Sequence, residues 1–205
     1  MCNEPPHDIP APNASTAIEP PTLTTARLLL RPYRTEDAAD VARLAGHEKV
    51  AASTENIPYP YSVEAAIEWI DSQAEKNRSG SGVNLRVGLR DTGEQVGGIG
   101  LVVQRAHLRA ELGYWISVPH WGNGYATEAS VAMLEYGFNT LNLNRIFAMY
   151  FAHNAASGRV MQKLGMTHEG CMRRHTLKDG RFLDMERYAI LHDEWSARRT
   201  TTGDA

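Results

Sequence analysis

A short turn with two glycines, Gly122-Asn123-Gly124, separates a strand-like segment from a helix-like one. Residues 109–118 before it carry the Tyr, Trp, Ile and Val typical of a strand, and residues 126–141 after it are rich in helix-forming side chains. Such a junction leaves unpaired backbone N–H groups at the positive end of a helix, and glycine lets a ligand approach them closely. The turn therefore predicts either a tight connection that needs a positive φ angle or a site for a phosphate-bearing ligand.

The rest of the chain alternates between strand-like and helix-like segments. Strands are expected at residues 27–33, 83–90, 95–104, 109–118, 145–151, 166–177 and 181–195. Helices are expected at residues 35–46, 62–76, 126–141 and 154–165. Thr35 and Ser62 are candidate N-caps, and Gly165 is a candidate helix terminator. This order indicates an α/β (α+β) domain with a central mixed sheet covered by helices.

The bulk composition is that of an ordinary globular domain. The chain has 205 residues, 42% of them hydrophobic, and a net charge of −3, which argues against a nucleic-acid platform. Residues 1–22 are rich in Pro, Ala and small polar residues and are expected to be a disordered tail; one domain is expected at 23–197 and a flexible tail at 198–205. The absence of a signal-peptide pattern and the isolated Cys2 and Cys171 favour the cytoplasm, and no histidine or cysteine spacing predicts a metal site.

The segment around the glycine turn resembles the acyl-CoA-binding signature of the GCN5-related N-acetyltransferases (GNAT), in the branch that contains RimJ and RimL. The signature Q/R-x-x-G-x-G/A aligns with residues 121–126, with Trp121 in the first place. Three further blocks resemble the same branch in the same order, at residues 25–38, 154–166 and 173–195. The resemblance covers about residues 23 to 195. It implies a mostly antiparallel sheet of about seven strands, in which the fourth and fifth strands splay apart, with about four helices.

The resemblance also implies acetyl-CoA as co-substrate, held where the strands at 109–118 and 145–151 diverge. The backbone of Ile116, Ser117 and Val118 is expected to bind the pantetheine arm like an added strand, with one N–H polarising the thioester carbonyl. The residues expected to cradle the pyrophosphate are Trp121, Gly122, Asn123, Gly124, Tyr125, Ala126 and Thr127. Asn154 is expected to bind the pantetheine arm, although its residue type also suits a helix N-cap.

Transfer in this family proceeds by direct attack of an amine on the thioester. Ser157 matches the serine proposed to protonate the coenzyme A thiolate, with a purely structural role as the alternative. The glutamate that RimL-like enzymes carry on the following strand is missing, because Thr176 stands at that position. Glu111 and His175 remain as candidate bases, although each has a simpler interpretation as an ordinary strand residue.

These features predict an N-acetyltransferase that uses acetyl-CoA and acts on a protein N-terminal α-amine or a small-molecule amine. An α-amine, with a pKa of about 7.7–8.0, needs less help from a base than a lysine, with a pKa of about 10.4. The missing glutamate leaves open a non-catalytic acyl-CoA-binding regulator. An aminoglycoside-type acetyltransferase would need an acidic acceptor cleft, and the sequence shows no acid cluster near the motif. The sequence identifies neither the acceptor nor the oligomeric state, although the family often forms homodimers.

Overall fold

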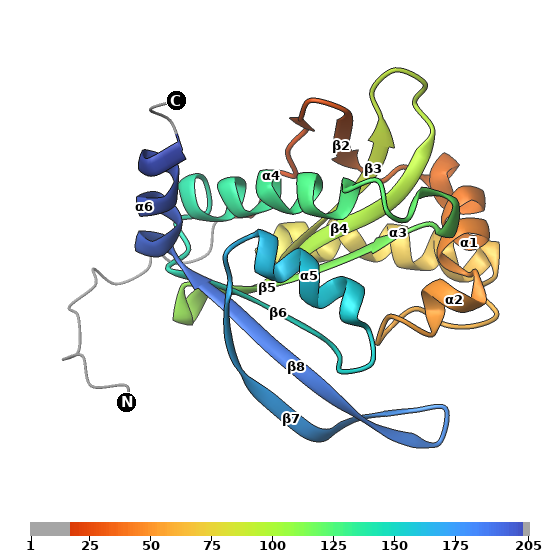
Figure 1. Ribbon diagram of the computed structural model, residues 1–205. Helices are drawn as coiled ribbons and strands as arrows, with labels where there is room; N and C mark the ends of the chain where they lie inside the picture. Colours follow the sequence, from red (N-terminus) through yellow and green to blue (C-terminus); the bar gives the residue numbers. More distant parts are fainter. Residues whose placement is uncertain (1–16, 203–205) are drawn as a thin grey trace.

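The computed structural model describes residues 17–202, which form a single eight-stranded sheet with helices packed against it (Figure 1). The strands are β1 (Leu23–Thr24), β2 (Leu28–Pro32), β3 (Gly82–Leu89), β4 (Gln95–Gln104), β5 (Arg109–Ile116), β6 (Arg145–Phe151), β7 (Thr167–Lys178) and β8 (Arg181–Leu191). The α-helices are α1 (Ala38–Ala45), α2 (Glu48–Ala51), α3 (Val63–Ser79), α4 (Tyr125–Asn139), α5 (Ala155–Lys163) and α6 (His192–Thr202). Short 3-10 helices lie at Thr35–Asp37, Arg105–His107 and Val118–His120.

The sheet is mostly antiparallel, as predicted. Its strand order is β1-β2-β3-β4-β5-β6-β8-β7, and only the β5–β6 pair among these described strands is parallel. The sheet has one strand more than expected, and there are two more α-helices. Strand β1 has two residues and α2 has four, which is too short for either to leave a periodic pattern in the sequence. Residues 192–195, expected to end the last strand, instead begin α6.

Strands β5 and β6 pair over only three positions, from Arg109 opposite Arg145 to Glu111 opposite Phe147. Beyond Glu111, β5 stays paired with β4, and β6 stays paired with β8. The two strands therefore diverge from this point on, which confirms the predicted splay. The gap opens toward the carboxyl end of β5, where the glycine turn follows.

Helices cover both faces of the sheet. Helix α4 buries Met133, Leu134 and Phe138 in the larger core cluster with the strands. On the other face, α1 and α3 pack together in a smaller cluster that includes Val41 and Ile70. The two clusters hold the helices against the sheet that contains the divergent strands.

Of the two predicted N-caps, Ser62 caps its helix and Thr35 does not. The Ser62 hydroxyl accepts a hydrogen bond from the Ala65 N–H at 3.1 Å, as expected for the cap of α3. Thr35 does not cap a helix, because it is the first residue of a 3-10 turn and α1 begins only at Ala38. The Asp37 carboxylate accepts from the Arg34 N–H at 2.8 Å and so satisfies the donor at this entry.

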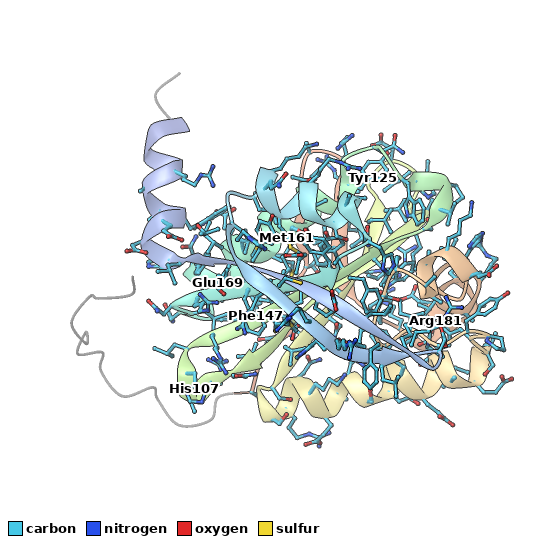
Figure 2. The ribbon with its side chains drawn as sticks, turned by 60° about the horizontal axis from the view of Figure 1, so that its bottom comes forward. His107, Tyr125, Phe147, Met161, Glu169 and Arg181 are labelled. Atoms are coloured by element: carbon cyan, nitrogen blue, oxygen red, sulfur yellow. The ribbon has the colours of Figure 1, made fainter. Side chains whose placement is uncertain are left out.

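The chain ends pack more extensively than the expected tails. Residues 1–16, which form most of the expected N-terminal tail, lie outside the described part. Ile18 is buried in the core, so the segment from residue 17 onward belongs to the folded unit. Helix α6 continues to Thr202, past the expected domain end at residue 197. Figure 2 shows Arg181 at the turn of the β7–β8 hairpin, which extends away from α6.

Candidate active site

Two cavities lie side by side over the divergent strands. The first, here called the turn cavity, has a volume of about 430 Å³ and is bounded by the glycine turn, the end of β5 and helix α5. The second, here called the cleft, has a volume of about 260 Å³ and lies between the sheet, α1, α3 and the loop at residues 53–57. The residues that line both cavities are Ser53, Thr54, Tyr114, Trp115 and Ser157. The two spaces therefore meet at a junction formed by these five side chains.

The glycine turn has the geometry that a phosphate site requires. Gly122 and Gly124 have φ angles of +80° and +79°, which a side chain would disfavour, and both glycines line the turn cavity. Gly124 is the residue before α4, so the first-turn amides of Tyr125, Ala126 and Thr127 have no acceptor within the helix and face this cavity. The positive end of α4 and these donors together favour an anion there.

Two of the residues predicted around the turn brace it. The Asn123 side chain donates to the His120 carbonyl at 3.1 Å and does not line the cavity. Trp121 lines the cavity, and its indole N–H donates to the Ile116 carbonyl at 2.7 Å. Asn123 thus holds the shape of the turn, while Trp121 forms part of the cavity wall.

The end of β5 offers less free backbone than expected. The Ser117 N–H donates to the Val96 carbonyl of β4 at 2.8 Å, and the Val118 carbonyl accepts from the Trp121 N–H. Neither Ser117 nor Val118 lines the turn cavity, whereas Ile116 does. Because backbone groups alternate sides along a strand, the Ile116 N–H points away from β4 toward the gap. Of the three residues expected to bind the pantetheine arm through their backbone, Ile116 is therefore the one that lines the turn cavity with an N–H that faces the gap.

Helix α5 places its first turn at the junction of the cavities. The Asn154 side chain accepts from the Ser157 N–H at 3.3 Å, as a helix cap does, and Asn154 also lines the turn cavity. Its amide donates to the Ser157 hydroxyl oxygen at 3.1 Å, which fixes that side chain at the junction. Capping and cavity lining therefore occur together at Asn154.

The sequence reasoning missed two basic residues of the turn cavity. Arg159 and Lys163 line it from α5, four residues apart and hence on one helix face. They give the cavity a positive side opposite the glycine turn. Their spacing was visible in the sequence, but the direction in which that face points was not.

Removing both charges tests this positive side. The double variant Arg159→Gln/Lys163→Gln is expected to bind acetyl-CoA about 10-fold more weakly, because two partly solvent-exposed charges each contribute roughly 0.5–1 kcal/mol to an anion. Its affinity should also fall less steeply with added salt. Calorimetric titrations at two salt concentrations measure both effects, and an unchanged salt dependence would show that these cations do not contact the ligand.

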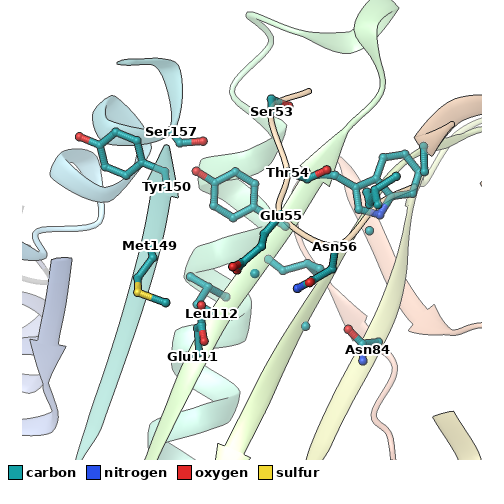
Figure 3. A pocket seen from close by; sticks show the side chains of 18 of the residues that line it. Ser53, Thr54, Glu55, Asn56, Asn84, Glu111, Leu112, Met149, Tyr150 and Ser157 are labelled. Carbon is teal, nitrogen blue, oxygen red and sulfur yellow. The ribbon is translucent and has the colours of Figure 1, made fainter. Parts of the chain in front are cut away.

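The cleft is lined by two acidic side chains. Within residues 17–202, the charged side chains that line it are Glu55 and Glu111, and its other polar groups include Asn84 (Figure 3). Burial raises the pKa of Glu111, and the nearby Glu55 carboxylate raises that pKa further, while Arg187 and His175 act in the opposite direction. His175 itself is exposed and lines neither cavity. Of the two candidate bases, only Glu111 is brought into the cleft.

The loop that carries Glu55 is fastened to the β7–β8 hairpin. The Thr176 hydroxyl donates to Glu55 Oε1 at 2.9 Å across 121 residues of sequence. The Lys178 ammonium donates to the Ala51 carbonyl at 2.8 Å and also to the Thr54 carbonyl. Sequence patterns gave no hint of Glu55, because its loop has no periodicity and its partners are remote in the chain.

Two tyrosines stand near the junction. Burial raises the pKa of Tyr114 to about 12, against an opposing effect of the neighbouring Ser157 side chain. Burial, together with Tyr188, raises the pKa of Tyr150 to about 12 as well. Both side chains line the cleft and stay protonated at neutral pH.

Among residues 17–202, neither a metal-binding cluster nor a helix fit to span a membrane is present. No group of three or more His, Cys, Asp and Glu side chains is placed to hold a metal ion. In the same residues, no helix combines the length and the apolar character that a membrane span requires.

Comparison with known proteins gives consistent matches. The sequence matches the family described as Acetyltransferase (GNAT) domain over residues 27–167. It is 28% identical to the spermidine N(1)-acetyltransferase of Escherichia coli K12, over 85% of this chain and 91% of that one. It is 29% identical to the [ribosomal protein uS5]-alanine N-acetyltransferase of the same organism, over 86% of this chain and 94% of the other.

A solved structure also matches closely. The structure of Mycobacterium smegmatis RimJ in complex with CoA-disulfide superposes with a TM-score of 0.76 at 26% identity, covering 86% of this chain and 89% of that one. The similarity covers most of both chains.

Proposed function

Because the chain belongs to the GNAT acetyltransferase family and is an N-acetyltransferase, we propose that it moves the acetyl group of acetyl-CoA to a protein N-terminal α-amine or a small-molecule amine. The observation that carries the proposal is the junction at which the turn cavity and the cleft meet. The cofactor can enter through the turn cavity and the acceptor through the cleft, and the two substrates would meet at this junction. Named relatives act on a polyamine and on a protein alanine, which are the two acceptor classes proposed.

In this arrangement the pyrophosphate of acetyl-CoA lies on the amides after Gly124, with Arg159 and Lys163 on the opposite side. The pantetheine arm runs along the gap beside Ile116 and Asn154 and brings the thioester to Ser157. The sheet thus binds the cofactor where β5 would otherwise pair with β6.

The acceptor amine occupies the cleft. Its two acidic side chains favour a cationic ammonium, and the aromatic side chains of Tyr33, Tyr61 and Trp69 line the same space. The cleft does have two carboxylates near the motif, which the sequence did not reveal. This supports positively charged acceptors in general and does not single out aminoglycosides.

The competing proposal is a regulator that binds acyl-CoA without turnover. An acceptor cleft connected to the thioester position favours the enzyme, because a sensor has no need of that second cavity. Release of free thiol from acetyl-CoA, measured against α-amine peptides, spermidine and free lysine, separates the two. Turnover with at least one amine is expected, and tight acetyl-CoA binding without thiol release for any of them would favour the regulator.

A further inference from the structure

We propose that Glu55 is the catalytic group that takes the proton from the acceptor ammonium, held in place by Thr176 and assisted by Glu111. This deepens the proposed function and rests on it. The sequence patterns pointed to β5 and β7 for the base, whereas Glu55 comes from the loop between α2 and α3. The inference is carried by three observations: the position of the loop, its attachment and the charges around it.

The loop is the structural element nearest to the reacting centre on the acceptor side. Ser53 and Thr54 line both cavities, and Glu55 follows them directly into the cleft. Figure 3 shows the Glu55 side chain extending from this loop into the cleft, between Thr54 and the more distant Glu111. Its carboxylate belongs to the residue after Thr54 and extends into the space that the acceptor amine would occupy.

The carboxylate is oriented rather than free. Its Oε1 accepts the Thr176 hydroxyl at 2.9 Å; Thr176 is 8% exposed while Glu55 is exposed, so this contact is partly shielded from water. That leaves Oε2 for the acceptor. Lys178, bonded to carbonyls on both sides of Ser53, keeps the loop from moving away. Oε1 thus holds the carboxylate in place through Thr176, and Oε2 can accept the proton from the acceptor ammonium.

The charges around Glu55 and Glu111 come from three elements and suit an ammonium. Glu111 from β5 adds a second negative charge, while His175 and Lys178 from β7 and Arg187 from β8 limit the repulsion between the two acids. An ammonium placed between the two carboxylates would be stabilised by both. Removal of its proton would then transfer the positive charge to the acidic pair, and the proton would remain on Glu55.

In the proposed acetyl transfer, two protons leave the acceptor nitrogen and one carbon–sulfur bond breaks. The acceptor enters as an ammonium, Glu55 takes one proton, and the freed lone pair on nitrogen attacks the carbonyl carbon. The carbon–sulfur bond breaks with its electron pair on sulfur. Sulfur receives the Ser157 proton, and the second proton on nitrogen replaces it on Ser157. The products are the acetylated amine, free coenzyme A thiol and a protonated Glu55, which returns its proton to solvent.

The test compares Glu55→Gln with Glu68→Gln, an exposed carboxamide control on α3 that lines neither cavity. With an N-terminal alanyl peptide and with spermidine as acceptors, Glu55→Gln is expected to lower kcat/KM by about 30-fold at pH 6.5, which is below the usual ~10²-fold or more for loss of a general base because Glu111 remains. For the peptide the defect should shrink by pH 9, where its α-amine is already neutral. Thr176→Val should show a smaller defect of the same pH dependence.

Acetyl-CoA affinity, measured by calorimetry, should be the same in the wild type and in the three variants. A failure of the Glu55 proposal can then be told apart from a failure of the proposed cofactor site. With the peptide, a defect of equal size at pH 6.5 and pH 9, or a Glu55→Gln rate within twofold of the control, would overturn the role of Glu55. A second measurement needs no acceptor: NMR titration of ¹³C-labelled glutamate should show a lower Glu111 pKa in Glu55→Gln, because a like charge is removed. An unmoved Glu111 titration would refute the acidic pair itself.

Discussion

Replacement of Gly124 by glutamate is expected to weaken acetyl-CoA binding by about 10³-fold or more. Gly124 precedes α4 with a φ of +79°, at the point where its amides turn toward the cavity. A carboxylate about 4 Å from a diphosphate at a partly exposed site costs about 4 kcal/mol in repulsion, which corresponds to roughly a 10³-fold loss of affinity. Isothermal titration calorimetry with acetyl-CoA measures the loss directly.

The matched control is Gly124→Gln, which has the same size and the same backbone strain but no charge. It is expected to bind more weakly than the wild type, because only glycine adopts this φ without cost, yet clearly more tightly than the glutamate variant. Thermal melts of both variants show whether the fold survives. If the two affinities lie within threefold of each other, charge plays no part and the pyrophosphate does not lie on this turn.

The turn could be predicted from the sequence because its cause is local. Two glycines between a strand and a helix require a particular backbone, and that backbone exposes amides whatever lies around it. The same holds for the strands at residues 95–104 and 145–151, whose predicted bounds coincide with β4 and β6. Local periodicity and residue type fully determine such features.

The acceptor side could be predicted only in part: Glu111 is a candidate from the sequence and lines the cleft, but the rest depends on contacts between residues far apart in the chain. Glu55 enters the cleft through a contact with Thr176, 121 residues away, and through a loop with no pattern of its own. The resemblance predicts a glutamate where Thr176 stands, so the sequence indicates the loss of a carboxylate there. In the structure the Thr176 hydroxyl donates to Glu55, another carboxylate of the cleft, which comparison at that one position does not reveal.

The binding of the two substrates and the chemistry depend on different parts of the fold. In the proposed arrangement the cofactor would meet backbone at the turn and the divergent strands, while the acceptor would meet side chains of the loop at residues 53–57 and of the sheet. Such a division would allow acceptor selectivity to change by substitution in residues 53–57 without disturbing the cofactor site.

Ser157 lies where these two parts meet, and Ser157→Ala is expected to lower kcat by about 10²-fold, the scale for loss of a positioned proton donor. Its hydroxyl oxygen accepts from the Asn154 amide at 3.1 Å, and its side chain lies beside Tyr114 at the junction. Acetyl-CoA affinity should change little, because Asn154 accepts the backbone N–H of residue 157 and this cap survives the substitution.

Ser72→Ala is a suitable control, since Ser72 is an exposed helix serine whose hydroxyl donates to the Trp69 carbonyl of its own helix, away from both cavities. Steady-state rates with the best amine from the acceptor panel measure kcat, and calorimetry measures cofactor affinity. A Ser157→Ala rate within twofold of Ser72→Ala would reduce Ser157 to a structural residue. The proton for the leaving thiolate would then have to come from Tyr114, whose buried hydroxyl lies at the same junction.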